Sequence, residues 1–186
     1  YFNSLNFKHF AKDEDLIELV TQDLSKVAGS HVQFELLNVD DLATHLPQGI
    51  CIDDLHLTVS PAPSEPDATL LTSDTSNALV EETLYSNLLR SNCPVTGQPD
   101  WGTIFIRYRG TKLSRASVLT YLISYRQHSG FHEQCVEQIF ADIWQMLKPE
   151  SLAVHAQYTR RGGLDINPCR SSDPAWLPQV KRLARQ

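Results

Sequence analysis

The sequence predicts an α+β protein, because its strand-like and helix-like segments are grouped along the chain rather than alternating one by one. Between residues 80 and 166 the predicted order is strand, strand, helix, helix, strand, strand. A proline-rich polar stretch at residues 60–66 precedes this group and is typical of a surface connection. At 186 residues, the chain is long enough for one sizeable core or two small ones.

The part before the connection contains one predicted helix and two predicted strands. Apolar residues recur at helical spacing over residues 13–27, and Gly29 supplies a stop. Residues 31–37 alternate and predict a half-buried strand, and a second strand is expected at residues 50–59. Residues 1–7 resemble the end of a strand and lack an initiator methionine, so we expect a fragment of a longer protein.

The part after the connection contains the grouped elements. Residues 80–91 and 101–109 predict two strands, and helical spacing of apolar residues follows at 114–126 and 131–147. Residues 152–158 alternate as a further strand.

The last predicted elements are a turn and a strand. The run Arg160-Arg161-Gly162-Gly163 predicts a hairpin turn that leads into a final strand through Ile166.

Two of the predicted helices resemble each other in sequence, since residues 14–20 align with residues 133–139 and each helix leads into an alternating strand. This similarity predicts an internal duplication of a ββααββ unit. We expect residues 1–75 to be the C-terminal part of a first copy plus a linker, and residues 76–186 to be a complete second copy.

Composition excludes several classes of protein. The net charge of −6 argues against a general nucleic-acid or membrane-surface partner. There is neither an apolar run of about 18 residues nor a start typical of a signal peptide, so a cytoplasmic protein is expected. The four cysteines never form a C-x-x-C pair, which favours free thiols in a reducing compartment.

One loop carries a pattern typical of an active site, Ser91-Asn-Cys-Pro-Val-Thr-Gly-Gln-Pro-Asp-Trp-Gly102. Pro94 and Pro99 exclude a helix interior, and Gly97 permits a tight turn between them. We therefore expect Cys93 and Asp100 to face one pocket.

Each of these two residues has a functional and a structural interpretation. A lone cysteine is usually a small buried hydrophobe, and we expect this of Cys51, Cys135 and Cys169. A thiol in a polar, proline-bent loop favours a nucleophile for Cys93, provided that a positive group or helix N-terminus lowers its pKa. Asp100 is either a turn residue or a general acid beside that thiol.

The triplet Phe131-His132-Glu133 opens the predicted helix over residues 131–147. A glutamate in a first helical turn ordinarily complements the helix dipole. The alternative is a heterocycle site, in which the carboxylate accepts two hydrogen bonds, the imidazole supplies a third and the aromatic ring stacks. His132 and Cys135 have no further close ligands beside them, so no metal site is predicted.

The run from Arg160 to Gly163 is either an exposed hairpin with solubilising arginines or a phosphate site. Guanidinium groups bind phosphates bidentately, and glycines let backbone N–H groups approach. No G-x-G-x-x-G sequence opens a helix, so a Rossmann-type cofactor site is not expected.

Four motifs together resemble one enzyme family. They are SNCPVTGQPDWG at 91–102, YRG at 108–110, FHEQCVE at 131–137 and YTRRGGLDINP at 158–168. This set resembles the NADPH-dependent 7-cyano-7-deazaguanine reductases of queuosine biosynthesis, in their long, two-repeat form, and the resemblance covers essentially the whole chain. It implies the tunnelling fold, in which ββααββ units assemble into oligomeric β-barrels.

The resemblance also implies roles for the loop and helix residues. Cys93 would attack the nitrile carbon of 7-cyano-7-deazaguanine to form a covalent thioimide, and Asp100 would give a proton to the nitrile nitrogen. His132 and Glu133 would bind the deazaguanine, with Phe131 beside it.

By the same resemblance, Arg160, Arg161 and Gly162 would contact NADPH. Conversion of the nitrile to a primary amine requires two hydride additions and therefore two NADPH. The expected partners are this small deazapurine and a second copy of the chain in a homodimer. The family's Glu-Ser-Lys run is missing here, and we expect it in a longer parent chain.

Two other classes of function stay open. A non-catalytic purine or pterin binder would keep Glu133 and would not need Cys93. A cysteine hydrolase of nitriles or amides would use Cys93 and would have no use for a phosphate site at Arg160 and Arg161.

Overall fold

The structure, a computed structural model, describes residues 1–57, 65–179 and 181–186. It divides into two compact units, Tyr1–Ala43 and Thr44–Gln186, and each is described by itself. The end of the strand predicted at 50–59 and most of the connection predicted at 60–66 lie outside the described residues. None of the described helices is long and apolar enough to cross a membrane.

The first unit is helical. It contains α1 (Phe2–Leu5), α2 (Asp13–Ala28) and the 3-10 helix η1 (Val39–Asp41). Helix α2 confirms the prediction over residues 13–27, and it ends at Gly29, whose φ of +64° lies in the left-handed region that favours glycine.

Two strand predictions in this unit are wrong. Residues 1–7 contain α1, and the described residues 31–37 form no strand. A strand is stable only where a neighbour pairs with its backbone, and no described strand of this unit is available to do so. The alternation of residues 31–37 instead lets Phe34 stack on Phe2, with ring centroids 6.2 Å apart.

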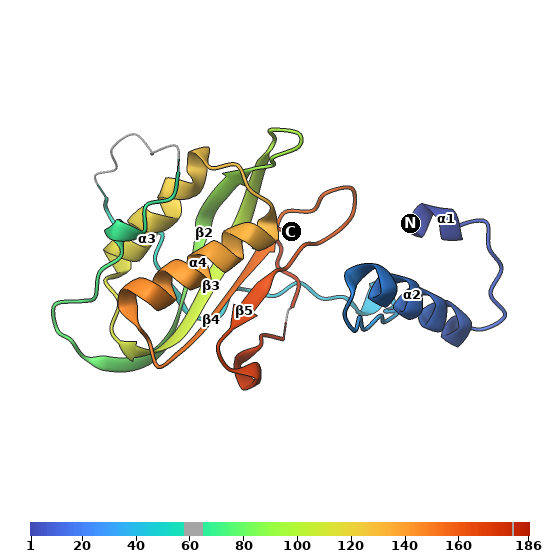
Figure 1. Ribbon diagram of the computed structural model, residues 1–186, viewed down its shortest axis with the longest axis horizontal. Coiled ribbons are helices and arrows are strands. Elements are labelled where there is room, and N and C mark those ends of the chain that lie inside the picture. The colour runs from blue at the N-terminus through green and yellow to red at the C-terminus, as the bar shows by residue number, and fades with distance from the viewer. Residues whose placement is uncertain (58–64, 180) are drawn as a thin grey trace. The chain divides into compact units, whose positions relative to one another are not determined.

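The second unit contains the predicted ββααββ order (Figure 1). In chain order the elements are β2 (Leu79–Asn92), β3 (Pro99–Thr111), α3 (Arg115–Ser124), α4 (His132–Leu147), β4 (Ser151–Tyr158) and β5 (Cys169–Ser171). A short strand, β1 (Ile50–Cys51), precedes them, and 3-10 helices lie at Ala68–Leu70, Tyr125–Gln127 and Pro174–Trp176. The α+β class and the ββααββ order are confirmed, whereas the tandem repeat and the division at residues 75 and 76 stay predictions.

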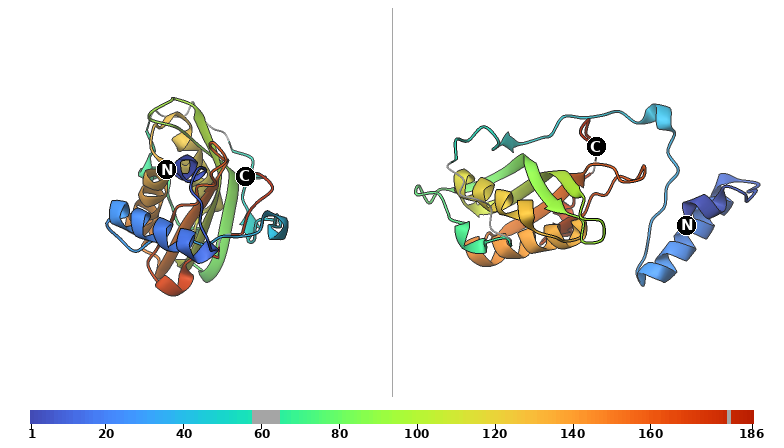
Figure 2. Two further views of the ribbon diagram at one scale, coloured as in Figure 1. Left: turned by 90° about the vertical axis from the view of Figure 1, so that its right-hand side faces the viewer. Right: turned by 90° about the horizontal axis from the view of Figure 1, so that it is seen from above.

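Among the described residues the sheet has the strand order β1-β2-β3-β4-β5, with β1 parallel to β2 and every other pair antiparallel. Helices α3 and α4 cover the same face of this sheet (Figures 1 and 2). Buried apolar side chains fill the space between the helices and the sheet, among them Leu84, Ile104, Leu119, Ile139 and Val154. The first residues of α4 therefore lie on the helical face of the sheet.

The final strand begins later than predicted. The backbone N–H groups of Tyr158 and Ala156 donate to the carbonyls of Ile166 (3.1 Å) and Pro168 (3.0 Å), so the chain already runs beside β4 there. Pro168 has no N–H to donate in return, and regular pairing begins only at Cys169.

A β-bulge in β2 changes which side chains face the helices. Ser86 is opposite Ile104, but the next paired residue, Leu89, is opposite Gly102. Buried residues on the helical face therefore have even numbers before the bulge and odd numbers after it, as at Leu84 and Ser91.

The carboxylate of Asp53 holds this bulge. It accepts hydrogen bonds from the Ser86 hydroxyl (2.6 Å), the Asn87 backbone N–H (3.0 Å) and the Asn87 side-chain amide (2.9 Å). The side-chain carbonyl of Asn87 in turn accepts from the hydroxyl of Thr103 on β3 (2.9 Å). A bulge interrupts the ladder between strands, and Asp53 replaces the partners that its backbone loses.

We predict that Asp53→Ala lowers the free energy of unfolding by about 1–3 kcal/mol, because partly buried donors at the bulge lose their acceptor. Asp54→Ala is the matched control, since the neighbouring Asp54 side chain is exposed. Urea unfolding of both variants measures the difference, and equal loss in the two would contradict the assigned role of Asp53.

Candidate active site

Cys93 lies in the hairpin loop that joins β2 to β3. Its backbone N–H donates to the carbonyl of Gln98 (2.8 Å), and its carbonyl accepts from the N–H of Gly97 (2.8 Å). Gly97 has a φ of +67°, which a tight turn requires at this point. The thiol is half-buried.

Strand register brings Cys93 to the same face as Asp100. Ser91 and Asp100 are paired across β2 and β3, and both are buried on the helical face. Cys93 lies just beyond the end of β2 at Asn92, and if the alternation of side chains continues by one residue past the strand, it points to that face as well. The expectation that the two residues share a pocket is consistent with this register.

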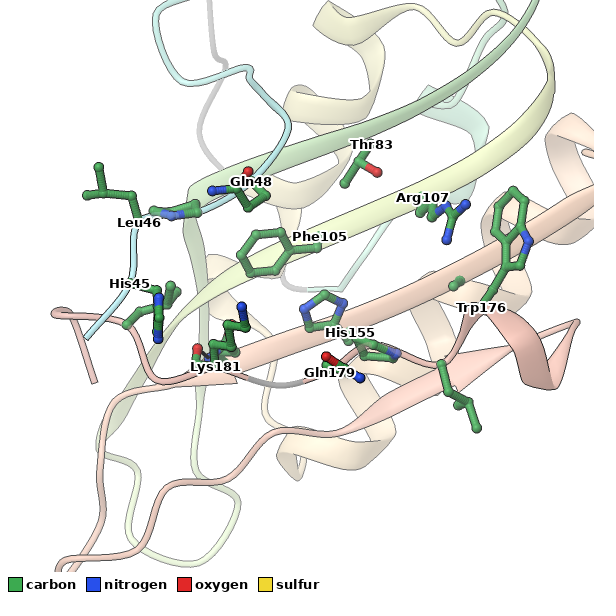
Figure 3. A pocket seen from close by; sticks show the side chains of 16 residues that line it. His45, Leu46, Gln48, Thr83, Phe105, Arg107, His155, Trp176, Gln179 and Lys181 are labelled. Carbon is green, nitrogen blue, oxygen red and sulfur yellow. Dashed lines mark hydrogen bonds between the residues drawn. The ribbon is translucent and has the colours of Figure 1, made fainter. Parts of the chain in front are cut away.

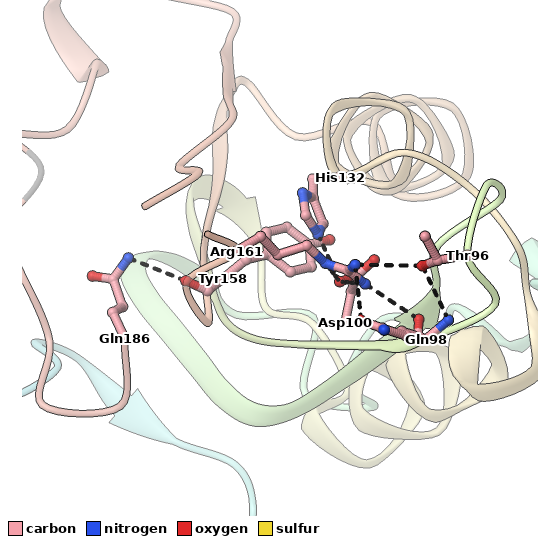
Figure 4. A network of polar contacts seen from close by, with 7 residues as sticks. All are labelled: Thr96, Gln98, Asp100, His132, Tyr158, Arg161 and Gln186. Carbon is pink, nitrogen blue, oxygen red and sulfur yellow. Dashed lines mark hydrogen bonds and ion pairs between the residues drawn. The ribbon is translucent and has the colours of Figure 1, made fainter. Parts of the chain in front are cut away.

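Asp100 is a buried carboxylate with two nitrogen groups beside it (Figure 4). Its side chain is only 5% exposed. The Nε of Arg161 donates to its Oδ1 over 2.6 Å, and the Nε2 of His132 lies 3.2 Å from the same oxygen. Arg161 and His132, which follow Asp100 by 61 and 32 positions in the chain, thus meet at one of its carboxylate oxygens.

The His132 ring is fixed from behind by Tyr158, the last residue of β4. The two ring centroids are 4.0 Å apart. Gly102 makes room for the tyrosine, because a Cβ there would lie 3.1 Å from the Tyr158 ring. The His132 Nε2 is close to Asp100 but makes no aligned hydrogen bond with any described residue, so it keeps the capacity to bond to a ligand.

The segment before α4 is tied to the end of β2. Asn92 donates its backbone N–H to the carbonyl of His128 (2.8 Å) and accepts from the N–H of Gly130 (3.1 Å). These bonds place Phe131 and the start of α4 next to the residue that precedes Cys93.

Phe131 and Glu133 are at the surface beside this site. Phe131 is 51% exposed, and its backbone N–H donates to the Gln134 side chain (3.1 Å). The Glu133 side chain is exposed, and no hydrogen bond or ion pair joins it to another described residue. Its carboxylate is therefore available to a ligand.

The predicted turn is a two-residue hairpin between Arg161 and Leu164, whose backbones exchange two hydrogen bonds of 3.0 Å. Gly162 and Gly163 have φ values of +57° and +83°, as a type I′ turn requires. A Cβ on either glycine would meet open space, so a ligand can approach the backbone closely.

A shallow pocket of about 260 Å³ lies beside this turn. Its lining residues are Gln98, Pro99, Asp100, Thr159, Arg160, Arg161 and Gly162. The Arg160 side chain is 47% exposed, and its nearest carboxylate, on Asp165, is 3.7 Å away. This pocket has the cation and the open glycine backbone that a phosphate group needs.

The surroundings of the Cys93 thiol favour its ionisation. Hydrogen bonds from the Thr96 side chain and from the backbone at Thr96 and Val95 lower its pKa, with a smaller contribution from the charge of Arg161. Burial raises the pKa of Cys135 and of Cys169. A lowered pKa increases the fraction of thiolate, which is the nucleophilic form.

The other cysteines only partly match their prediction. Cys135 is buried, as predicted, but Cys169 is half-buried. The prediction is wrong for Cys51, which is exposed because β1 is an edge strand. Across the described ranges, no group of three or more histidine, cysteine or acidic side chains is arranged to hold a metal ion.

A larger pocket of about 390 Å³ lies against the opposite face of the sheet and contains none of the predicted site residues (Figure 3). Phe105 and His155 stack there with centroids 4.4 Å apart. Burial lowers the pKa of His155 to about 4, so this imidazole is neutral at neutral pH. Its described lining residues include no cysteine or carboxylate, whereas Asp100 and His132 lie on the helical face.

Sequence reasoning missed the residues that support this site: Thr96, Gln98, Gly102 and Tyr158. All of them lie inside the four quoted motifs, and membership of a motif was the only sign in the sequence that they belong to the site. Their contacts depend on strand pairing between distant segments, so spacing alone did not reveal them.

Comparison with known proteins identifies the family. A reductase of Acinetobacter baumannii strain ATCC 17978, named NADPH-dependent 7-cyano-7-deazaguanine reductase, is 63% identical over all 186 residues, which span 68% of that protein. The chain belongs to the family of NADPH-dependent 7-cyano-7-deazaguanine reductases. Members from Acinetobacter baylyi and Psychrobacter cryohalolentis are 61% and 50% identical, and the chain spans 68% and 70% of their lengths.

Two further comparisons are narrower. The family model described as QueF-like protein matches residues 99–175, which include Asp100, α4 and the Arg161 turn. A crystal structure of the archaeosine synthase QueF-Like in the apo form is 20% identical, with a TM-score of 0.44 over 50% of this chain and 92% of that one. The reductase family confirms the resemblance carried by the four motifs.

We predict that iodoacetamide modifies Cys93 faster than Cys51 at about pH 7, because a lowered pKa leaves more thiolate at a given pH. Cys51 is the internal control, since its side chain is exposed whereas Cys93 is half-buried, so access alone would favour Cys51. Peptide mass spectrometry over time measures both rates, and faster modification of Cys51 would show that the loop does not activate its thiol.

Proposed function

We propose that this chain reduces the nitrile of 7-cyano-7-deazaguanine to a primary amine with NADPH, through a covalent thioimide on Cys93. The observation that carries the proposal is a thiol of lowered pKa on the same sheet face as a buried carboxylate and an imidazole. Membership of the reductase family supports the substrate and the cofactor.

In the first step, the Cys93 sulfur forms a bond to the nitrile carbon while one π bond of C≡N breaks and its electron pair goes to nitrogen. The thiol loses one proton and the nitrile nitrogen gains one. Asp100 is on the same face as the thiol, and we assign it the transfer of this proton. The product is a thioimide with a neutral C=N–H group.

The thioimide makes the first reduction easier because its carbon is electrophilic. Bound NADPH would supply the hydride for this carbon, and conversion of the nitrile to the amine takes two hydrides and two protons in all, with Cys93 released as the free thiol. His132 is held beside Asp100 by Tyr158, so its free nitrogen is available to bond to the substrate. The residues that fit the cofactor phosphates are those of the turn, Arg160 and Gly162 above all.

Glu133 and Phe131 are the proposed binding residues for the base of the substrate. A carboxylate accepts two hydrogen bonds from adjacent N–H donors, which is the pattern that a guanine-like edge presents. Glu133 is exposed and has no described polar partner, and the ring of Phe131 is half exposed beside it. Both are carried by the start of α4, which is rigidly packed on the sheet.

We further propose that the chain works on this small molecule in the cytoplasm rather than on nucleic acid, and that it forms a homodimer. The net charge of −6 supports the first point. Residues 76–186 would be the complete tunnelling-fold repeat in that assembly, and residues 1–75 the end of another.

We predict that incubation with 7-cyano-7-deazaguanine and NADPH consumes two NADPH per substrate and gives the aminomethyl product. Cys93→Ala abolishes both, whereas Cys51→Ala, which removes another accessible thiol, leaves them unchanged. Nicotinamide absorbance and mass spectrometry of the product measure the two outcomes. Release of ammonia without consumption of NADPH would overturn the reductase in favour of a hydrolase.

We predict that Glu133→Gln weakens substrate binding by about tenfold or more, because an amide cannot accept both hydrogen bonds from the guanine-like edge. Glu137→Gln is the control, since Glu137 is exposed one turn further along α4. Calorimetric titration in the Cys93→Ala background isolates binding from covalent chemistry, and equal affinity in both variants would refute the role of Glu133.

A further inference from the structure

Two side chains near the end of β2, Arg90 and Asn92, hold the connection that leads from the helical turn at Tyr125–Gln127 into α4. The last carbonyls of a helical segment have no donor within that segment. Here β2 supplies donors to the carbonyls of three consecutive residues: the Arg90 guanidinium to Arg126, the Asn92 side-chain amide to Gln127 (3.3 Å), and the Asn92 backbone N–H to His128 (2.8 Å).

Arg90 also fixes the side chain of Asn92. Its Nη2 donates to the Asn92 Oδ1 (3.0 Å), and its guanidinium carbon lies 5.8 Å from the ring centroid of Trp101, the residue paired with it on β3. The Asn92 amide therefore directs its oxygen to Arg90 and its nitrogen to Gln127. The reverse orientation would put an NH₂ group against the guanidinium and an oxygen against a carbonyl, so only one orientation bonds to both partners.

The connection has little room to move between these contacts. The N–H of Gly130 donates to the Asn92 carbonyl (3.1 Å). A Cβ on Gly130 would lie 2.8 Å from the Nε2 of His128 and 3.4 Å from the Sγ of Cys135. Residues 131–133 follow directly, and Asn92 directly precedes Cys93. Asn92 thus joins the thiol loop to the start of α4.

We propose that Asn92 is a positioning residue for the attack of Cys93 on the nitrile, and that Arg90 holds Asn92 in that role. This inference rests on the proposed function, because it concerns the same substrate and the same bond. In that substrate the nitrile and the guanine-like edge belong to one planar fused ring system, so the distance between them is fixed. The protein groups that bind the two ends, Cys93 and Glu133, must therefore be held at a matching distance.

Loss of the Asn92 side chain would change this distance without removing either group. The hairpin keeps its backbone bonds between Cys93 and the residues Gln98 and Gly97, and Glu133 keeps its carboxylate. A misplacement of about 1 Å at the reacting atoms can cost about 100-fold in rate. We therefore expect the rate of bond formation to fall while the affinity for the base and the reactivity of the free thiol stay nearly the same.

The test measures thioimide formation on Cys93 in the full chain, by mass spectrometry over time with 7-cyano-7-deazaguanine and without NADPH. For Asn92→Ala we expect the rate constant at saturating substrate to fall by roughly 10- to 100-fold. Substrate affinity, measured by calorimetry in the Cys93→Ala background, changes by less than about threefold. Alkylation of Cys93 by iodoacetamide, which needs no bound substrate, changes by less than about twofold.

Three further variants separate the contacts of Asn92. Asn92→Asp keeps the acceptor for Arg90 but directs a second acceptor at the Gln127 carbonyl, so the loss is at least as large as with alanine. Arg90→Gln removes the cation that supports Asn92 and gives a smaller loss. Gln127→Ala is the matched control, because it removes an exposed side chain from the same connection and keeps the carbonyl that Asn92 contacts. It leaves the rate constant unchanged.

Hydrogen exchange of the amides of residues 128–133 is a second readout that needs no substrate. We expect faster exchange in Asn92→Ala and no change in Gln127→Ala. Unchanged exchange in Asn92→Ala, or faster exchange with a wild-type rate of thioimide formation, would overturn the proposal. A loss of affinity as large as the loss of rate would also overturn it, since Asn92 would then support binding alone. Absence of the adduct in the wild-type chain is the separate outcome that refutes the proposed function and, with it, this role.

Discussion

A buried carboxylate is the constraint on which this site depends. Asp100 lies at the start of β3 and is almost completely removed from water, and a charged group in that position must be paired. Arg161 pairs with it from a turn 61 residues away, and His132 approaches it from the start of α4. The hairpin, the turn and the helix therefore meet at a single carboxylate oxygen.

The same arrangement also affects the pKa of the Cys93 thiol. Its pKa is lowered first by hydrogen bonds from Thr96 and then by the charge of Arg161, which also contacts Thr96. The group that neutralises the buried carboxylate thus also contributes to the environment that favours the thiolate.

The site also depends on the β-bulge between Ser86 and Leu89. Without it, alternation along β2 would turn Ser91, and with it Cys93, away from Asp100 and toward the opposite face. Asp53 holds the bulge, although it is distant from the thiol in sequence and takes no part in the chemistry. A residue outside the recognised motifs therefore helps to decide which face of the sheet the end of β2 presents to Asp100, just before the candidate nucleophile Cys93.

Much of the fold and most of the site residues were accessible from the sequence. Helical spacing predicted α2, α3 and α4, alternation predicted β2, β3 and β4, and the proline-bent loop singled out Cys93 and Asp100. The strand predictions at residues 1–7 and 31–37 failed for one reason. A strand-like sequence shows that a segment suits a sheet, but it does not supply the neighbouring strand with which the segment must pair.

Local sequence by itself determined helices α2, α3 and α4, strands β2, β3 and β4, the turn at Gly162 and Gly163, and the family, because these depend on residues close together in the chain. Only the tertiary structure decided that Arg161 pairs with Asp100, that Tyr158 supports His132, and that the bulge brings Cys93 to the helical face. Those contacts follow from strand register and helix packing between segments tens of residues apart, and no local pattern records them.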